Sequence, residues 1–356
     1  MDLALMEYPF KGLKVVELAS ILAGPLVGSF FGEKGAQVFK VENPKTDGDP
    51  TRGWKNESEG TPDGISAYYI SANAPKIVQE LDVFEDTEKL HQLLFDADIL
   101  IHNFTDSKCA ELQLSSNSLK EKYPRLISGQ IKGFSNSEKP AFDFLMQART
   151  GLLAMTGLDE NNLAKLPLAW IDVLSAHQLY EALLIGLLER GNTQTGSHWS
   201  VSLEETALAS LINQGSNAII GKTDPKPLGT LHPNIAPYGE CFFTQDGAQL
   251  AFAIGTDKQF SRLWKVLFGD LPNVSYSTNS KRLQNRANLK DALELKIESE
   301  SLQHWETVFT ENQLPITRIL GVKEALNSEE GKSLTSMLNY TEGDFPRVQS
   351  SVFKRI

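Results

Sequence analysis

Residues 13–42 read LKVVELASILAGPLVGSFFGEKGAQVFKVE, and this stretch predicts a strand, a helix and a second strand. Residues 13–19 and 36–42 are short apolar runs typical of buried strands, and residues 25–34 between them predict a short helix. Parallel strands need such a crossover, so the stretch indicates a βαβ unit. Within SILAGP (20–25), a glycine followed by a proline turns the chain and begins a helix whose free N–H groups face a ligand.

The glycines of this helix and the units that follow it extend the same pattern. Gly24, Gly28 and Gly32 recur every four residues, so they share one face and permit close packing on the sheet. Helices and strands then alternate: helices at 87–96 and 116–122, strands at 98–103 and 125–131. The alternation predicts an α/β fold with a doubly wound, Rossmann-like parallel sheet. Asn103 and Lys132 come just after two of these strands, at the edge where such sheets bind ligands.

The second half of the chain predicts a smaller α/β domain. Residues 241–243 and 249–254 flank Asp246-Gly247, a strong hairpin signal. Three helices are expected after the hairpin, at 257–268, 289–299 and 302–311. The expected organisation is a large domain (1–220), a Pro/Gly-rich linker (221–239), a small α/β domain (240–312) and a return to the large domain (313–356).

Asp172 is the only charged residue among the ten apolar or small neighbours in KLPLAWIDVLSA (165–176) that follow Lys165. A carboxylate among apolar neighbours is rare unless it is paired or used, because desolvation costs several kcal/mol. In one interpretation Asp172 is the N-cap of a helix over 173–190, worth about 1 kcal/mol. In the other it is a partly desolvated nucleophile toward an activated acyl group, held at the positive end of that helix. The two interpretations are compatible.

Composition excludes several classes of function. The 356 residues suit two domains, and a net charge of −11 argues against a nucleic-acid partner. No apolar run approaches the length of a membrane span, and the N-terminus lacks the pattern of a signal peptide, so we expect a cytoplasmic protein without a membrane partner. Cys109, Cys241 and the scattered histidines have no metal-ligand spacing, so we expect no metal site.

Several motifs along nearly the whole chain are similar to those of the class III CoA-transferase family, the group of formyl-CoA transferase and carnitine CoA-transferase. In order, these are GLKVVELASILAGP, GAQVFKVENP with GDPTRGW, ILIHNF, YPRLISGQIKGFS, FDFLMQARTG, the segment around Asp172, HPNIAPYGECFFTQDG and LPITRI. The resemblance implies that Asp172 is the catalytic nucleophile. It would attack an acyl-CoA thioester to give a mixed anhydride and then an aspartyl-CoA thioester, which a small carboxylic acid acceptor resolves.

The resemblance also implies a binding site and an assembly. CoA is a substrate and product rather than a permanently bound cofactor, and the family forms interlocked homodimers. The residues expected to contact CoA are Leu22, Ala23, Lys76, Asn103, Phe104, Lys108 and Lys132.

The chain departs from the family pattern where the family carries cations, at Asn73-Ala74-Pro75, in the turn of residues 105–107 and near Glu111. The formyl-CoA branch has a Gln where Leu22 stands, which argues against oxalate or formyl specificity.

Three alternatives to a CoA-transferase remain open. The missing cations keep open a non-catalytic acyl-CoA-binding homologue. A related acyl-CoA racemase uses a His where Phe142 stands, and a phenylalanine cannot carry a proton, although a two-carboxylate site of Asp143 with Asp172 stays open. A nicotinamide-linked dehydrogenase has only the first βαβ unit and Glu42 in its favour, without the glycine fingerprint.

Overall fold

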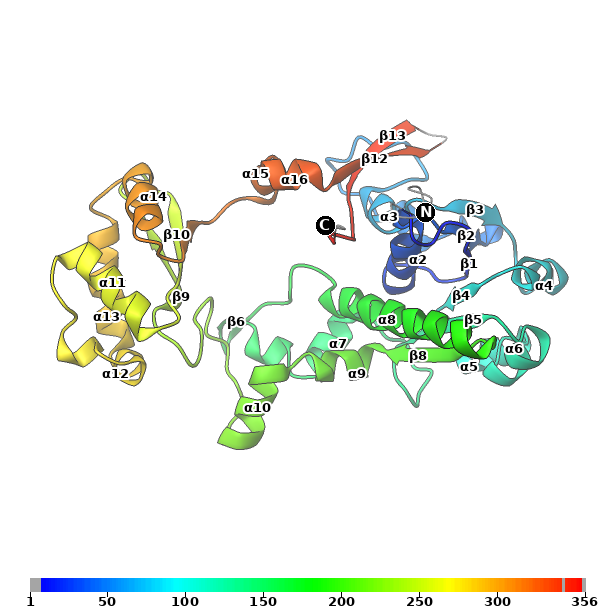
Figure 1. Ribbon diagram of the computed structural model, residues 1–356, viewed down its shortest axis with the longest axis horizontal. Helices are drawn as coiled ribbons and strands as arrows, with labels where there is room; N and C mark the ends of the chain where they lie inside the picture. Colours follow the sequence, from blue (N-terminus) through cyan, green and yellow to red (C-terminus); the bar gives the residue numbers. More distant parts are fainter. Residues whose placement is uncertain (1–7, 341–342, 354–356) are drawn as a thin grey trace. The chain divides into compact units, whose positions relative to one another are not determined.

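The computed structural model describes residues 8–340 and 343–353 and divides the chain into two compact units (Figure 1). The larger unit takes in the described residues up to Leu153, Lys165–Asp224 and those from Glu329 onward. The smaller unit consists of Ala154–Ala164 and Pro225–Ser328.

The larger unit is built on six parallel strands in the order β3-β2-β1-β4-β5-β8. Their bounds are β1 (Lys14–Glu17), β2 (Gln37–Glu42), β3 (Ile77–Glu80), β4 (Ile99–His102), β5 (Ile127–Lys132) and β8 (His198–Ser202). The helix α2 (Ala23–Glu33) connects β1 to β2, so the βαβ prediction is confirmed. The strand order reverses between β1 and β4, which places the crevice of a doubly wound sheet after these two strands.

Helices cover both faces of this sheet, because alternate side chains of each buried strand point to opposite faces. Val15 belongs to a core cluster shared with α2, α8 (Trp170–Thr193) and α9 (Leu203–Ala209), and Figure 1 shows α2 and α8 along the same side of the sheet. Val16 packs on the other face with α4 (Thr87–Phe95), α5 (Asp106–Glu111) and α6 (Ser116–Lys122). The doubly wound α/β class is therefore confirmed.

The face of α2 that carries Gly24, Gly28 and Gly32 packs closely on neighbouring residues, as the spacing of these glycines predicts. A Cβ on Gly24 would stand 2.3 Å from Cβ of Ala19, and one on Gly28 would stand 1.8 Å from Oε2 of Glu17. Any side chain at these positions would push the helix away from β1. The close packing also leaves the Glu17 carboxylate enclosed beneath the helix, with no exposed surface.

Helix α8 differs from its prediction in two respects. It begins at Trp170 with Ala169 as N-cap, so Asp172 lies inside the first turn and the N-cap interpretation is wrong. Secondly, no apolar run of membrane-spanning length was expected, and this expectation is wrong: α8 has 24 residues and a most apolar window of mean hydropathy 1.3, so its length and composition would allow it to span a membrane. The core helix of a water-soluble fold passes the same test, and here Ile171, Leu179 and Leu183 pack against the sheet.

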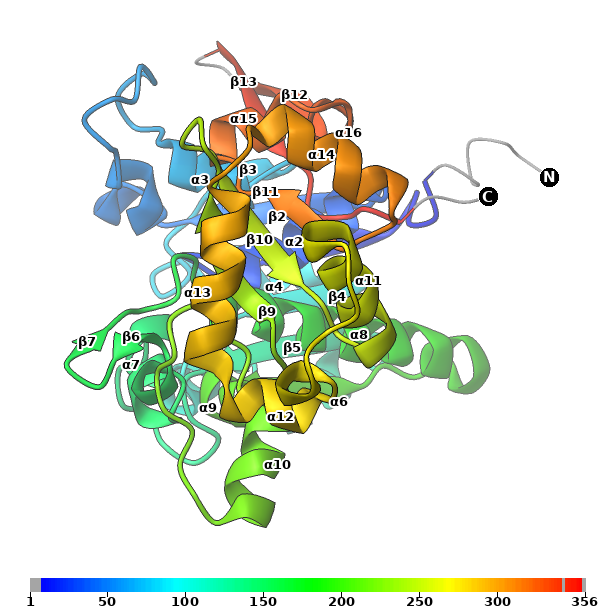
Figure 2. The ribbon, with the colours of Figure 1, turned by 90° about the vertical axis from the view of Figure 1, so that its left-hand side faces the viewer.

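The smaller unit has an antiparallel sheet in the order β11-β10-β9, with helices on one core. The strands are β9 (Tyr238–Phe243), β10 (Gln249–Ala253) and β11 (Ile316–Arg318), and the helices are α11 (Asp257–Phe268), α12 (Asn279–Gln284), α13 (Arg286–Ile297), α14 (Leu302–Glu311) and α15 (Val322–Leu326). The predicted hairpin is confirmed by the pairing of β9 with β10, and Figure 2 shows α11, α13 and α14 around these strands. The short pair β6 (Gly157–Asp159) and β7 (Asn162–Leu163) belongs to the same unit.

The return to the larger unit comes later than expected. Residues 313–328 were expected to have rejoined the large domain, but β11 pairs with β10, so the chain returns only at Glu329. There α16 (Glu329–Ser333) precedes the hairpin of β12 (Thr335–Tyr340) and β13 (Gly343–Val348), which packs on α3 (Ala67–Ala72). The remaining helices of the larger unit are α7 (Asp143–Arg149) and α10 (Ile212–Gly221).

Candidate active site

The carboxyl edge of the parallel sheet carries a cavity of about 350 Å³ that Asp172 lines. The loops after β1, β4 and β5 form much of its wall, because the carboxyl ends of parallel strands lie at one edge. The cavity brings together five residues that were predicted from the sequence to act together: Leu22, Ala23, Asn103, Lys132 and Asp172.

Asp172 also lines a second and larger cavity, of about 850 Å³. Its wall is mostly apolar and rich in aromatic rings: Trp54, Tyr68, Phe142, Phe144 and Trp170. Both cavities lie wholly within the larger unit. The carboxylate is therefore shared by a smaller cavity with mixed polar and apolar walls and a larger one with mostly apolar walls.

Within the described part of the chain, no hydrogen bond or ion pair reaches the half-buried carboxylate of Asp172. Burial, and secondly the charge of Asp143, raise the pKa of Asp172 from 3.8 to about 7. A carboxylate with that pKa is about half ionised at neutral pH and is more basic, hence more nucleophilic, than an ordinary aspartate. Perturbed acids in cavities mark candidate catalytic groups.

Asp143 and Gln147 of α7 fix the start of the helix that carries Asp172. Oδ1 of Asp143 accepts the main-chain N–H of Ile171 at 2.7 Å, and Oδ2 accepts Nε2 of Gln147 at 2.6 Å. Oε1 of Gln147 in turn accepts the N–H of Leu166 at 2.9 Å. Since the Ala169 N-cap offers no side-chain acceptor, Asp143 takes over the capping role that the sequence analysis considered for Asp172.

Tyr68 is a site residue that the sequence analysis missed. Its ring packs edge-on against Trp54 with centroids 5.2 Å apart, and both line the larger cavity. Burial, then the charges of Asp172, Asp143 and Asp49, raise the pKa of Tyr68 to about 12, so its hydroxyl stays protonated and can donate. Nothing in the local pattern around AYYI distinguishes this tyrosine, because only the fold brings α3 to the cavity.

The predicted CoA-contacting residues occupy different positions. Nδ2 of Asn103 donates to Ser20 O at 3.2 Å, and Nζ of Lys132 pairs with Oδ2 of Asp106 at 2.7 Å, both at the cavity. Phe104 lines a neighbouring cavity of about 370 Å³. Lys108 lies on the surface with Nζ 6.0 Å from the ring centroid of Phe84, outside the walls of the cavities that Asp172 lines.

Lys76 requires a correction. Its side chain has no exposed surface, and Nζ lies 2.8 Å from Oε2 of Glu17 under α2. Nζ also donates to the carbonyls of Pro25 at 2.7 Å and Ala72 at 2.9 Å. An ammonium enclosed in this way has no surface to offer a CoA phosphate, so its role is structural.

A parallel sheet that presents a desolvated acid to a cavity at its carboxyl edge suits covalent acyl transfer. The chain belongs to CoA-transferase family III, whose sequence profile matches residues 10–353. It is 31% identical over 334 residues to the succinate–glutarate CoA-transferase of Agrobacterium fabrum, covering 91% of this chain and 83% of that protein. It is 30% identical over 325 residues to the succinyl-CoA:glutarate CoA-transferase of Homo sapiens, covering 88% and 72%.

A solved structure agrees with this assignment. A CAIB/BAIF family protein from Brucella suis superposes with a TM-score of 0.83 at 30% identity, covering 98% of this chain and 93% of that one. The family resemblance and the enzyme class expected from the sequence, a CoA-transferase, are thus confirmed.

Proposed function

We propose that this protein transfers CoA from an acyl-CoA thioester to a carboxylic acid through covalent intermediates on Asp172. The observation that carries the proposal is a single carboxylate, without a partner among the described residues, that lines two cavities and has its pKa raised to about 7. Family membership supports CoA transfer in general, and this carboxylate supports the route.

The proposed route has four balanced steps. Oδ of Asp172 attacks the thioester carbonyl, the C–S bond breaks, and CoA leaves as a thiolate with an acyl-aspartyl anhydride behind it. The thiolate attacks the aspartyl carbonyl and releases the donor acid as a carboxylate. The acceptor carboxylate then attacks this aspartyl-CoA thioester and expels the thiolate again. The thiolate finally attacks the acceptor carbonyl, which gives the new acyl-CoA and frees Asp172.

The surroundings of Asp172 suit these steps. An apolar cavity limits the water that would hydrolyse an anhydride, and it keeps the nucleophile weakly solvated. Donors for the tetrahedral oxyanion are the N–H groups of Ala23 and Gly24 at the start of α2, which have no intrahelical acceptor, and the hydroxyl of Tyr68. One well-aimed donor of this kind contributes about 3 to 4 kcal/mol.

We propose that CoA lies against the smaller cavity, where Leu22, Ala23, Asn103 and Lys132 meet. Phe104 and Lys108 would extend this surface toward the nucleotide, whereas Lys76 is left out. The expected cytoplasmic location and homodimer are part of the same proposal; sedimentation at several protein concentrations tests the dimer.

A non-catalytic acyl-CoA binder is the second candidate. It is favoured by the small supply of free cations, since Lys76 is buried and Lys132 is paired with Asp106. The two candidates differ in whether a covalent enzyme adduct forms.

The deciding experiment is mass spectrometry of CoA products after incubation with mixed acyl-CoA donors and carboxylates. Succinate and glutarate belong in the panel because the relatives are named for them. The expected result is new acyl-CoA species with the wild type and none with Asp172→Asn. The variant should have the same thermal stability as the wild type at low pH, which shows that it is folded. Exchange that survives Asp172→Asn overturns the role of Asp172, and a wild type that binds acyl-CoA without exchange favours the binder.

A further inference from the structure

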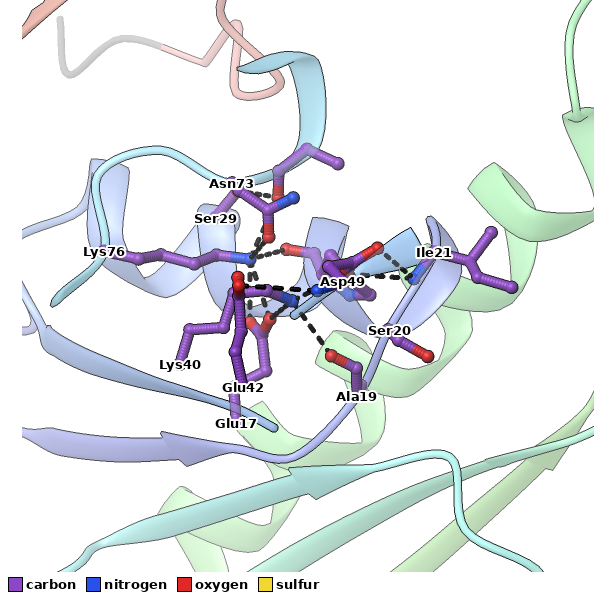
Figure 3. Close-up of polar contacts among 12 residues, drawn as sticks. Glu17, Ala19, Ser20, Ile21, Ser29, Lys40, Glu42, Asp49, Asn73 and Lys76 are labelled. Carbon is purple, nitrogen blue, oxygen red and sulfur yellow. Dashed lines mark hydrogen bonds and ion pairs between the residues drawn. The ribbon is translucent and has the colours of Figure 1, made fainter. Parts of the chain in front are cut away.

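A cluster of buried charges lies directly behind the SILAGP turn (Figure 3). We call Glu17, Lys40, Glu42, Asp49 and Lys76 the buried charge cluster; each has at most about a tenth of its side chain exposed. No local sequence pattern predicts this cluster, because its members come from β1, β2 and the loops before η2 (Pro50–Gly53) and β3. A buried set of charges needs a reason, since desolvation is costly unless each charge is paired.

Lys40 is the centre of this cluster. Its Nζ lies 3.1 Å from Oε1 of Glu17 and 3.0 Å from Oδ2 of Asp49, and it donates to Ala19 O at 3.0 Å. Burial by itself lowers the pKa of Lys40, but Glu17 and Asp49 outweigh it and the net shift is upward. Lys40 is therefore a cation that fixes both Asp49 and the carbonyl of Ala19, two residues after β1.

Asp49 reaches from this cluster to the turn itself. The main-chain N–H of Ile21 donates to Oδ2 of Asp49 at 3.2 Å and approaches Oδ1 at 3.4 Å. Oδ1 also accepts the N–H and the hydroxyl of Thr51, at 3.0 and 2.7 Å, so the carboxylate has little freedom to rotate. Figure 3 shows Asp49 between Lys40 and Ile21.

Ile21 has a backbone conformation that is unfavourable for a β-branched side chain. Its φ is +76°, in the left-handed region that a β-branched residue rarely adopts. Such a residue costs on the order of 1 to 3 kcal/mol and persists only where its surroundings impose it. The hydrogen bond from the Ile21 N–H to Asp49 can hold Ile21 in this left-handed conformation.

The consequence for the active site follows from sequence order. Ile21 and Leu22 line both cavities that Asp172 lines, and Ala23, the first residue of α2, lines the smaller one. A change of φ at Ile21 would therefore swing the N–H groups of Ala23 and Gly24 relative to Asp172. A misplacement of about 1 Å at a reacting centre is enough for a 100-fold loss of rate.

We propose that Asp49 is a positioning residue for CoA transfer, which holds Ile21 in its left-handed conformation and so sets the start of α2 against the bound thioester. The inference rests on the proposed function of the Asp172 site. Asp49 acts through the main chain of Ile21 and does not touch the reacting atoms.

Asp49→Asn and Glu42→Gln form a matched pair of variants. Both side chains are nearly buried, at 3% and 6% exposed, and both changes replace a carboxylate of the cluster by an amide. In Asp49→Asn an NH₂ group replaces one carboxylate oxygen. This donor then faces either the Ile21 N–H and Lys40, or the N–H and hydroxyl of Thr51, which are donors themselves. Glu42 accepts the hydroxyl of Tyr69 at 2.8 Å, Nε of Arg52 at 2.7 Å and, more weakly, the main-chain N–H of Asp49 at 3.4 Å. None of these three hydrogen bonds reaches Ile21.

We expect Asp49→Asn to lower kcat/KM for acyl-CoA at least about tenfold while KM for the acceptor acid stays unchanged. Glu42→Gln should lower the melting temperature by a similar amount but keep kcat/KM within about twofold of wild type. Equal kinetic losses in both variants, or none in Asp49→Asn, overturn the proposal.

Ile21→Gly supplies a second test that leaves the charge cluster intact. Glycine adopts φ +76° without strain, so the turn no longer needs Asp49 to impose it. In a double-mutant cycle, the loss caused by Asp49→Asn should be several-fold smaller with glycine at position 21 than with isoleucine. Equal losses in the two backgrounds overturn the proposal even where Asp49→Asn alone is poorly active.

The same cycle measured with free coenzyme A as ligand separates this inference from the proposed function. We expect the Kd of CoA to rise in Asp49→Asn, with the same coupling to position 21, whether or not CoA transfer is detected. A wild type that binds CoA but shows no transfer contradicts the proposed function, whereas a CoA affinity indifferent to Asp49 contradicts the positioning role.

Discussion

Asp143 holds the helix of Asp172 by its main chain: Oδ1 of Asp143 accepts the N–H of Ile171 at 2.7 Å, one residue before the proposed nucleophile. The same carboxylate is, after burial, the second cause of the raised pKa of Asp172. One side chain therefore affects both the place and the basicity of the acid.

Asp143→Asn separates these two effects. The amide oxygen can still accept the N–H of Ile171, but the negative charge is gone, so the pKa of Asp172 should fall. In the wild type kcat/KM should decline about tenfold per pH unit below pH 7, because only ionised Asp172 attacks. In Asp143→Asn this decline should begin at lower pH. If the decline of kcat/KM begins at the same pH in Asp143→Asn and in the wild type, the charge of Asp143 has no effect on Asp172.

Asp143→Ala is the control for the mechanical effect. It removes the acceptor as well as the charge, so the first turn of α8 loses its cap at a cost of about 1 kcal/mol. We expect lower thermal stability and lower kcat than in Asp143→Asn.

Asp172→Asn should stabilise the fold in a pH-dependent way. The pKa of Asp172 is 3.8 as a free side chain and about 7 in the fold, so ionisation favours the unfolded chain. The protonated acid contributes its full stability below pH 4, and this contribution is lost as pH rises toward 7. The melting temperature of Asp172→Asn should match that of the wild type near pH 4 and exceed it increasingly up to pH 7. A constant difference would exclude a raised pKa.

Tyr68→Phe tests the hydroxyl that the sequence analysis missed. Its pKa of about 12 keeps it protonated, so the phenylalanine variant loses a donor in the larger cavity that Asp172 lines, without a change of shape. We expect kcat to fall about 10- to 100-fold with little change in melting temperature. Tyr69→Phe is not a suitable control, because Tyr69 bonds Glu42 in the buried charge cluster. An unchanged kcat in Tyr68→Phe would remove Tyr68 from the site.

Substitutions of Lys132 and of its ion-pair partner Asp106 should change KM for acyl-CoA in opposite directions. If Lys132 meets a phosphate of CoA, Lys132→Met should raise KM for acyl-CoA about tenfold, since a charge-assisted bond is lost. KM for the matching acyl-pantetheine, which has no phosphate, should stay unchanged. Asp106→Asn releases Lys132 and should lower KM for acyl-CoA. Equal effects of Lys132→Met on both substrates would place Lys132 away from the phosphates.

The regular elements were predictable because their signals are local. The βαβ unit of α2, the hairpin at Asp246-Gly247 and the helix Asp257–Phe268 each carry their periodicity and turn residues within a few positions. The grouping of Leu22, Asn103 and Lys132 was predictable for a related reason, whereas Asp172, on the first turn of α8, was linked to them only by the family resemblance. Strand ends in a parallel sheet meet at one edge, whatever the tertiary details.

What the sequence concealed depends on contacts between distant segments. Lys76 looks like a surface cation until Gly28 and the rest of α2 cover it with Glu17. The C-terminal hairpin is held where it is partly by hydrogen bonds that Tyr340 and Arg347 donate to the carbonyls of Asn73 and Ala74, more than 260 residues earlier in the chain. The pairing of β11 with β10 likewise joins strands more than 60 residues apart, which no local pattern encodes.

The most direct test of the central claim is to trap the intermediate on Asp172. The protein is incubated with acyl-CoA in the absence of an acceptor, treated with hydroxylamine or borohydride, digested and sequenced by mass spectrometry. Our account predicts an aspartyl hydroxamate, or the reduced alcohol, at residue 172 and at no other carboxylate. Active protein whose peptide around Asp172 stays unmodified would contradict it.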